Sequence, residues 1–229
     1  MIKLSKRLKL IADFVDDGAK TIDIGCDHAL LDIYLVKEKK VSQSIASDIN
    51  ESALNQAKIN IKKHNLEGKI DIRLGDGLKV LNNKEVNTII ISGLGSPKII
   101  CILDEGKKKL NNINNIIIQS NSDAYLIRKK LTKLGYFIKD EKLTKENNIT
   151  YQIILFKKGK KHYSKAQLML GPKLLLRQEK LLVSLIESDF KKLTMLLNKI
   201  PNKYFLKRYK IKRKMRMLQK YKVIITNNL

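Results

Sequence analysis

A short loop that combines one glycine with two aspartates is the first segment with the residue types of a ligand site. Residues 23–29 read Asp23-Ile24-Gly25-Cys26-Asp27-His28-Ala29 and follow an apolar run typical of a buried strand. Gly25 allows a tight turn in which a ligand can approach the backbone closely. The dinucleotide fingerprint G-x-G-x-x-G is incomplete, because Asp27 and Leu30 replace its second and third glycines. The two carboxylates would repel a pyrophosphate but suit a cation. The loop therefore favours S-adenosylmethionine, which carries a sulfonium and an ammonium, over NAD.

Further acids follow the next two predicted strands. Asp48 comes directly after residues 44–47, where a carboxylate could accept hydrogen bonds from both hydroxyls of a ribose. Asp76 follows residues 70–74, between two glycines, and could accept a hydrogen bond from an adenine amine. Taken alone, each acid would equally suit a solvated turn or a helix N-cap.

A glycine-rich loop, Gly93-Leu94-Gly95, follows the fourth predicted strand at residues 88–91. Its two glycines let backbone carbonyls come close to a methyl donor and a flat base. Four such loops at successive strand ends predict one site for S-adenosylmethionine. The residues predicted to contact the cofactor are Gly25, Asp27, His28, Asp48, Ile49, Asp76, Gly77, Gly93, Leu94 and Gly95.

These loops can meet only if the strands before them lie side by side in one sheet. Buried parallel strands are predicted at residues 21–24, 44–47, 70–74, 88–91 and 116–119, and two more strands at 137–143 and 150–156. Helices are predicted at residues 2–15, 30–39, 51–64, 97–110 and 124–134. The alternation implies an α/β, Rossmann-like fold of the class I methyltransferase type. Its seven-stranded sheet has helices on both faces and binds ligands beyond the carboxyl ends of the strands.

The composition changes after residue 156. Residues 157–161, Lys-Lys-Gly-Lys-Lys, read as an exposed linker. Gly171-Pro172 then opens a long helical pattern that Pro201-Asn202 should end, and a second helix over residues 203–222 would pair with it in a coiled-coil-like hairpin. The predicted domains are residues 1–160, which form the methyltransferase domain, and residues 161–229, which form a basic helical hairpin.

Most of the positive charge lies in this last third. The chain has a net charge of +25, and residues 157–229 carry 21 basic and three acidic side chains. This asymmetry favours a polyanionic partner, because lysines and arginines that neutralise phosphates release counterions. The alternative is codon bias in an AT-rich genome, since the chain is rich in Lys, Ile and Asn. The predicted RNA contacts are Arg7, Tyr151, Lys207, Arg208, Lys212, Arg213 and Arg216.

Other classes of site receive no support from the sequence. Cys26 and Cys101 lie far apart and have no metal-ligand spacing, so no metal is expected. No apolar run approaches the roughly 20 residues that a bilayer requires. The expectations are a reduced cytoplasmic setting and a monomeric chain.

Several motifs occur in the order found in one known family. They are residues 4–8 (Leu-Ser-Lys-Arg-Leu), the loop at 23–29, residues 75–78 (Gly-Asp-Gly-Leu), residues 93–95, residues 119–121 (Gln-Ser-Asn) and the pair at 171–172. Over nearly its full length the chain resembles the TrmK family of bacterial tRNA (adenine-N1)-methyltransferases, which act at tRNA position 22. The resemblance implies a class I methyltransferase domain, a coiled-coil-like C-terminal domain, S-adenosylmethionine as donor and tRNA as substrate. The chain departs from the family pattern where Leu94-Gly95-Ser96 replaces Met-Gly-Gly and Gln119-Ser120-Asn121 replaces Gln-Pro-Asn.

The residues predicted to act in methyl transfer are Asp27, His28 and Asn121. Asp27 could orient the donor or the amine of the substrate base, whereas His28 could act in transfer or only brace the loop. Ring nitrogen 1 of adenine lies on the Watson–Crick edge, so the base must be unpaired or flipped out. A methyltransferase acting on DNA, ribosomal RNA or a small molecule is an alternative. So is a non-catalytic RNA-binding protein with a degenerate methyltransferase fold. The fourth strand lacks an Asn/Asp-Pro-Pro-aromatic motif, which argues against methylation of the exocyclic amine of adenine.

Overall fold

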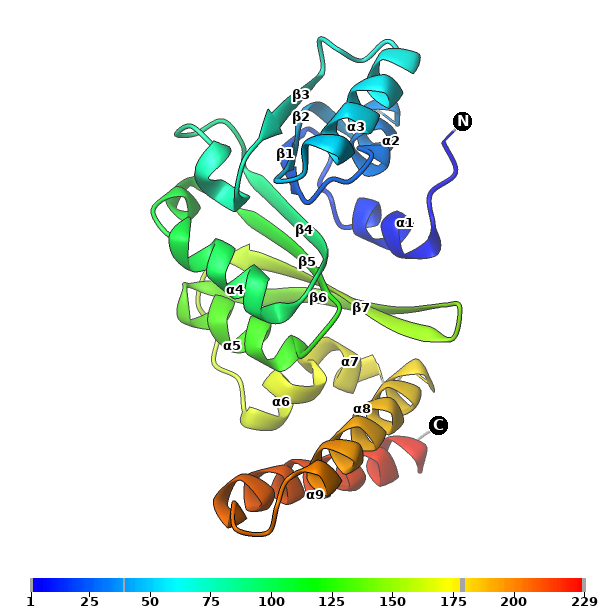
Figure 1. Cartoon of the computed structure of the whole chain (residues 1–229), viewed down its shortest axis with the longest axis vertical. Helices are drawn as coiled ribbons and strands as arrows, with labels where there is room; N and C mark the ends of the chain where they lie inside the picture. Colours follow the sequence, from blue (N-terminus) through cyan, green and yellow to red (C-terminus); the bar gives the residue numbers. More distant parts are fainter. Residues whose placement is uncertain (1, 39, 178–179, 228–229) are drawn as a thin grey trace. The chain divides into compact units, whose positions relative to one another are not determined.

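The computed structural model describes residues 2–38, 40–177 and 180–227. The chain divides into two compact units, Met1–His162 and Tyr163–Leu229. The first unit is a sheet covered by helices, and the second is entirely helical over its described residues (Figure 1). No helix among the described residues has both the length and the apolar character that crossing a membrane requires.

The first unit contains the predicted seven-stranded sheet, in the order β3-β2-β1-β4-β5-β7-β6. The strands β1 to β5 pair in parallel, whereas β7 runs antiparallel to both β5 and β6. Their bounds are β1 Ala19–Ile24, β2 Val41–Asp48, β3 Ile70–Leu74, β4 Thr88–Leu94, β5 Asn115–Ser120, β6 Tyr136–Glu146 and β7 Ile149–Lys158. The α/β prediction is thus confirmed.

The central strands form because their apolar side chains are buried on both faces of the sheet. Ile90 of β4 and Ile117 of β5 are paired in register and pack in one hydrophobic cluster with residues of the helices α1, α2 and α3. Their neighbours Ile89 and Ile116 are also fully buried, and the alternation of a strand turns them to the opposite face. Figure 1 shows α4 and α5 on that other side of the sheet.

The helices of the first unit are α1 Lys6–Asp13, α2 Leu30–Lys37, α3 Glu51–Lys63, α4 Ser96–Glu105 and α5 Ala124–Lys133, and two short 3-10 turns span Gly77–Val80 and Lys109–Asn112. The first helix is shorter than the predicted 2–15, because Ser5 caps its start by accepting a hydrogen bond from the Leu8 backbone at 3.3 Å. The predicted helix 30–39 ends at Lys37, and its last residue, Lys39, lies outside the described residues.

The sheet changes direction between β1 and β4, and this sets where a ligand can bind. From β1 the chain winds outward through β2 to β3, and it then returns to place β4 and β5 on the other side of β1. The loops that leave β1 and β4 therefore diverge toward opposite faces of the sheet. In such folds a crevice opens at the carboxyl ends of these two strands.

The last two strands form a longer hairpin than the sequence suggested. Its turn consists of Asn147 and Asn148, whose φ angles of 47° and 63° suit a two-residue hairpin turn. The pairing extends to Lys157 and Lys158, which lie opposite residues of β6. These two lysines are exposed, as predicted. Their assignment to a linker was wrong, because antiparallel pairing continues to the end of β7.

The second unit contains α6 Lys165–Leu170, α7 Pro172–Arg177, α8 Lys180–Lys199 and α9 Phe205–Thr226. The helix α6, which the sequence did not predict, begins at a capping box formed by Ser164 and Gln167. The helices α8 and α9 pack together as a helical hairpin (Figure 1). Ile211, Leu218 and Ile225 of α9 recur at intervals of seven residues and are buried, as expected for a coiled-coil-like seam.

Candidate active site

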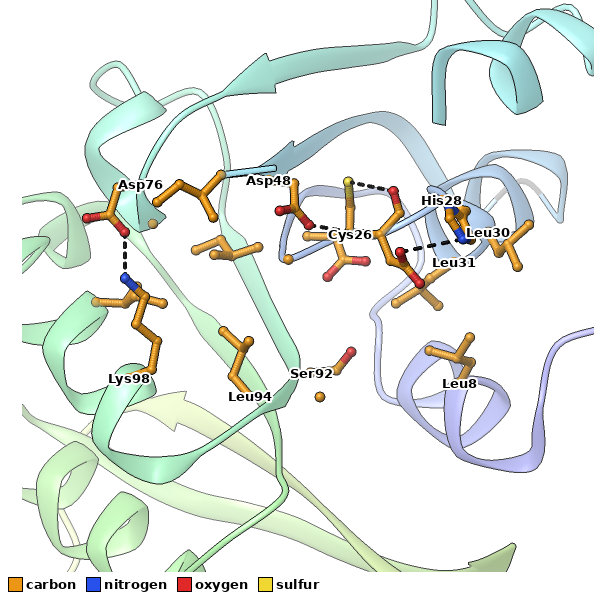
Figure 2. A pocket seen from close by; sticks show the side chains of 18 of the residues that line it. Leu8, Cys26, His28, Leu30, Leu31, Asp48, Asp76, Ser92, Leu94 and Lys98 are labelled. Atoms are coloured by element: carbon orange, nitrogen blue, oxygen red, sulfur yellow. Dashed lines mark hydrogen bonds and ion pairs between the residues drawn. The ribbon is translucent and has the colours of Figure 1, made fainter. Parts of the chain in front are cut away.

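A cavity of about 390 Å³ opens at the carboxyl ends of β1, β2, β3 and β4 (Figure 2). Of the residues predicted to contact the cofactor, the structure brings nine together around it, and Gly95 lies outside the lining. The nine are Gly25, Asp27, His28, Asp48, Ile49, Asp76, Gly77, Gly93 and Leu94. These residues come from the carboxyl ends of β1, β2, β3 and β4 and from the segments that follow them.

The first loop is held against β2 by its own backbone. The amides of Gly25 and Cys26 both donate to the Ser47 carbonyl, at 2.8 and 3.1 Å. Gly25 has a φ of 77°, a left-handed conformation that a glycine adopts without strain. Asp27 also has a positive φ, 52°, which aspartate tolerates better than most residues. The loop is thus fixed before any ligand binds.

The side chains at the tip of this loop are open to solvent. The Asp27 side chain is 75% exposed, and one of its carboxylate oxygens lies 3.6 Å from Nε2 of His28. Figure 2 shows His28 beside the cavity, and the backbone amide of Asp27 donates to Asp48 at 3.3 Å. Asp27 and His28 can therefore reach a ligand that enters the cavity, and they also brace one another.

The carboxylate of Asp48 is fixed by two backbone donors. Its Oδ1 accepts from the amide of Asn50 at 2.9 Å, and its Oδ2 accepts from the amide of Asp27 at 3.3 Å. Each carboxylate oxygen has two acceptor positions, so both oxygens retain the capacity to accept hydroxyl groups. Ile49 lines the cavity beside it and is 65% exposed. This oxygen pair suits the two hydroxyls of a ribose.

Asp76 has two lysine partners that the sequence reading missed. Its Oδ1 accepts from Lys98 at 2.9 Å and its Oδ2 from Lys79 at 3.0 Å. The hydrogen bond from Lys98 is the main reason why the pKa of Asp76 lies below its usual value. Lys98 lies on α4 and lines the cavity opposite Asp76 (Figure 2). Asp76 therefore remains ionised, and the two lysines fix its orientation at the cavity.

Two buried acids lie beneath the first loop. Asp23, at the end of β1, lines the cavity with only 3% of its surface exposed, and its Oδ1 has no hydrogen-bond partner among the described residues. Burial, followed by the nearby Asp32, raises the pKa of Asp23 well above its usual value. An unpartnered carboxylate oxygen at the wall of a cavity fits a cationic ligand.

The second buried acid, Asp32 of α2, is fully enclosed. It accepts a hydrogen bond from Ser44 of β2 at 2.5 Å, and Ser44 in turn shares one with Thr21 of β1 at 2.7 Å. Burial raises the pKa of Asp32 to about 7, although the bond from Ser44 opposes this shift. This chain of polar groups ties α2 to β1 and β2, the strands that carry Asp23 and Asp48.

The other wall of the cavity depends on Gln119 at the end of β5, a residue that is fully buried. Its Oε1 accepts from Arg7 at 2.6 Å and from the Gly93 amide at 3.0 Å. Its Nε2 donates to Asn121 at 3.0 Å, and Asn121 donates to the Gly93 carbonyl at 2.6 Å. Asn121 is absent from the lining of the cavity, so its observed contacts brace the end of β4.

Arg7 connects this network to an aromatic ring on β7. Its guanidinium lies 5.6 Å from the centre of the Tyr151 ring, and its backbone amide donates to Glu146 of β6 at 2.5 Å. Arg7 and its neighbour Leu8 line the cavity. The helix α1 thus supplies part of the wall, which explains why an N-terminal segment outside the sheet belongs to the site.

The predicted RNA contacts of the C-terminal region all lie on α9. Lys207, Lys212, Arg213 and Arg216 are exposed there. Arg208 is half-buried instead, and it donates to the carbonyls of Leu197 and Ile200 at 2.8 and 2.5 Å. Arg208 therefore ties the start of α9 to the end of α8 and is less available to a partner than its neighbours.

Sequence reasoning missed several residues that line the cavity: Leu8, Leu30, Leu31, Ser92, Lys98 and Ile102. Of these, Lys98 had a detectable signal, because it lies in the first turn of the helix that follows the glycine-rich loop. The leucines had none, since leucines on amphipathic helices are usually core residues. No group of three or more potential metal ligands occurs among the residues that the structure describes.

A seven-stranded sheet of this order, with an acidic cavity at its switch point, defines a Rossmann-like, S-adenosylmethionine-dependent methyltransferase. The family model described as tRNA (adenine(22)-N(1))-methyltransferase, TrmK, matches residues 21–220. The chain belongs to this family.

Individual relatives agree with the family model. The tRNA (adenine(22)-N(1))-methyltransferase of Bacillus subtilis is 38% identical over 158 residues, which cover 69% of this chain and 66% of that protein. The crystal structure of the B. subtilis m1A22 tRNA methyltransferase TrmK has a TM-score of 0.89 at 29% identity and covers 96% of this chain and 99% of that one. The structure of M. capricolum TrmK with S-adenosyl-homocysteine has a TM-score of 0.86 at 33% identity and covers 97% of this chain and 99% of that one.

Proposed function

We propose that this protein transfers the methyl group of S-adenosylmethionine to ring nitrogen 1 of adenine 22 in tRNA. The observation that carries this proposal is the acidic cavity at the switch point of the sheet, in a chain whose residues 21–220 match the TrmK family model. The M. capricolum relative was solved with S-adenosyl-homocysteine, the product of this cofactor.

The lining of the cavity fits the cofactor residue by residue. Asp23 offers an unpartnered buried oxygen to a positive charge, and the fixed oxygens of Asp48 suit the ribose hydroxyls. Ile49 and Leu94 supply apolar surface for a purine ring. When bound, S-adenosylmethionine supplies an electrophilic methyl group on a cationic sulfur. The residues of this chain hold that group in place and exclude competing nucleophiles.

The protein does not have to activate the target nitrogen by removing a proton. Nitrogen 1 of neutral adenine carries a free electron pair, so correct alignment is the main requirement. Methylation leaves the base with a positive charge, which nearby oxygens stabilise. The Gly93 carbonyl and the Asp27 carboxylate are candidate oxygens beside the cavity. We assign Asp27 and His28 to orienting the substrates, and Gln119 and Asn121 to holding Gly93 at the end of β4.

The second unit supplies the surface for tRNA in this proposal. No acidic residue follows Asp189, whereas lysines and arginines are dense along α9. Side chains of this kind contact backbone phosphates, and A-form RNA is recognised largely through its shape and backbone. Removing residues after 165 should weaken tRNA binding severely while leaving cofactor binding nearly unchanged. Unchanged tRNA affinity would instead assign the charge to codon bias.

The direct test is to incubate the protein with unmodified tRNA and labelled S-adenosylmethionine, and then to map the methylated nucleotide. Label at nitrogen 1 of adenine 22, lost in a tRNA with guanine at that position, is the expected result. Label elsewhere would assign another substrate. A protein that binds tRNA but gives no calorimetric heat with S-adenosylmethionine would be a non-catalytic RNA-binding protein. We expect a monomer that works in the cytoplasm, and sedimentation and cell fractionation test these two points.

A further inference from the structure

The tip of the α8–α9 hairpin exposes an apolar surface that the hairpin itself does not use. We define the tip surface as the exposed side chains of Tyr204, Phe205, Leu206 and Tyr209. Their exposed fractions are 53%, 69%, 63% and 59%. Two tyrosines, a phenylalanine and a leucine exposed within six consecutive residues require an explanation, because contiguous apolar surface on a soluble protein usually marks a binding site.

The orientation of these side chains follows from the helical period. The helix α9 buries Ile211, and each residue along a helix turns by about 100°. Phe205, Leu206 and Tyr209 therefore point about 120° to 160° away from Ile211 around the axis. The tip surface thus faces away from the α8–α9 seam, and packing between the two helices cannot explain it.

The tip surface is also held in a fixed shape. Arg208 donates to the carbonyls of Leu197 and Ile200 at the end of α8, at 2.8 and 2.5 Å. The backbone amide of Tyr204 donates to the Pro201 carbonyl at 3.1 Å, and Tyr204 accepts from the amide of Arg208 at 3.1 Å. These bonds order the turn and the first residues of α9. A rigid ring loses little conformational entropy when a partner stacks on it.

The charge around the tip surface selects the kind of partner. Lys203, Lys207 and Lys210 are exposed between and beside the aromatic residues, and the ammonium of Lys203 lies 5.4 Å from the centre of the Tyr204 ring. No acidic residue follows Asp189 in the sequence. Aromatic rings that alternate with cations are the chemistry that binds unpaired nucleotides, since the rings stack on bases while the cations contact phosphates. A second copy of this tip would be repelled by the same charge.

We propose that the tip surface stacks on nucleobases that the fold of the tRNA leaves unpaired. This inference rests on the proposed function, and it adds a contact that depends on RNA shape to the phosphate contacts along α9. A regular duplex buries the faces of its bases, whereas the loops of a folded RNA expose them. The hairpin would therefore distinguish a folded tRNA from duplex RNA of equal charge.

The test compares variants of the full chain in binding to an unmodified tRNA transcript and to a blunt RNA duplex of similar length. Replacing Tyr204, Phe205 and Tyr209 together by alanine should weaken tRNA binding roughly tenfold or more, because a stacked base contributes substantially to affinity. Binding to the duplex should change little. Tyr204→Phe and Tyr209→Phe keep the rings and should keep tRNA affinity, while Leu176→Ser, at a residue 78% exposed in the same unit, is the matched control.

The salt dependence separates stacking from charge. In the triple alanine variant, the slope of log affinity against log salt concentration should equal that of the wild type, whereas Lys207→Ala should reduce it. Circular dichroism and the melting temperature establish that each variant is folded. Unchanged tRNA affinity in the folded triple variant would overturn the inference. If the variant lost self-association and kept its tRNA affinity, the tip surface would be a contact between copies of this chain, and the inference would also be overturned. If the wild type itself neither binds nor methylates tRNA, the proposed function fails first.

Discussion

Replacing Asp23 by asparagine should weaken cofactor binding while making the ligand-free protein more stable. The side chain is 3% exposed and its Oδ1 lacks a partner, so the ionised carboxylate is unfavourable until a cation binds. A hydrogen bond to a charged group contributes about 1.5–3 kcal/mol. Loss of this interaction should therefore raise the Kd for S-adenosylmethionine by roughly 10- to 150-fold.

The predicted gain in stability has the same cause as the loss of cofactor affinity, namely the buried charge of Asp23. An unsatisfied buried polar group costs about 1–3 kcal/mol, and an amide in place of the Asp23 carboxylate removes the charged part of that cost. We expect the free energy of unfolding of the ligand-free protein at pH 8.5 to rise by about 1 kcal/mol. The effect should disappear at low pH, where the wild-type carboxyl is already protonated, because burial raises the pKa of Asp23.

Calorimetric titration with S-adenosylmethionine and urea unfolding at two pH values measure both effects. Asp27→Asn is the matched control, because it changes an acid of the same loop whose side chain is 75% exposed. It should leave the unfolding free energy unchanged at either pH. An Asp23→Asn protein that binds the cofactor as tightly as the wild type, or that is less stable at pH 8.5, would refute the assignment of Asp23 as the buried counter-charge.

Three further predictions concern buried polar groups. Burial raises the pKa of Asp32 to about 7. The stability that Asp32 contributes is therefore complete below the usual carboxyl pKa and is lost as the pH rises through 7. Urea unfolding from pH 5 to 9 should show this fall in the free energy of unfolding, and the fall should be smaller in Asp32→Asn. Gln119→Ala removes the group that joins Arg7, Gly93 and Asn121. It should lower kcat by roughly 10- to 100-fold with little change in the Kd for tRNA. An equal loss of turnover and of tRNA affinity would instead indicate general unfolding. Glu141→Gln breaks the fully buried ion pair with Arg128 at 2.7 Å and should cost about 3–5 kcal/mol of stability, measured by urea unfolding, with Arg128→Met combined with Glu141→Leu recovering much of it.

The sequence predicted the central strands well because their positions depend on local composition. Runs such as Ile89, Ile90 and Ile91 are apolar on both faces, and only a strand buried on both sides uses such a run. The edge hairpin was predicted less well, because β6 and β7 extend through polar residues whose pairing depends on partners elsewhere in the chain. The lysines at the end of β7 illustrate this, since their composition is that of a linker.

The acids at the strand ends could be located from the sequence, but their partners could not. Asp48 and Asp76 follow strands that are easily recognised, so their position at one edge of the sheet follows from the fold class. The link from Asp32 to Ser44, twelve positions later, carries no local signal, because each residue looks ordinary in its own element. The hydrogen bond between Gln119 and Arg7 depends on where α1 packs. The sequence predicted this helix before the first strand but not its position against the sheet.

The position of α1 has a consequence for the order in which the domain is assembled. Arg7 is synthesised before any strand, yet its partners are Gln119 and Glu146, which are 112 and 139 positions away. Contacts of such long range form late during folding, because their loop-closure entropy must be met first. A growing chain that has been synthesised beyond β4 but not as far as β6 contains the acidic residues of the cavity, but Arg7 still lacks its partner Glu146. Competence to bind the methyl donor should therefore arise abruptly, as the β6–β7 hairpin emerges from the ribosome.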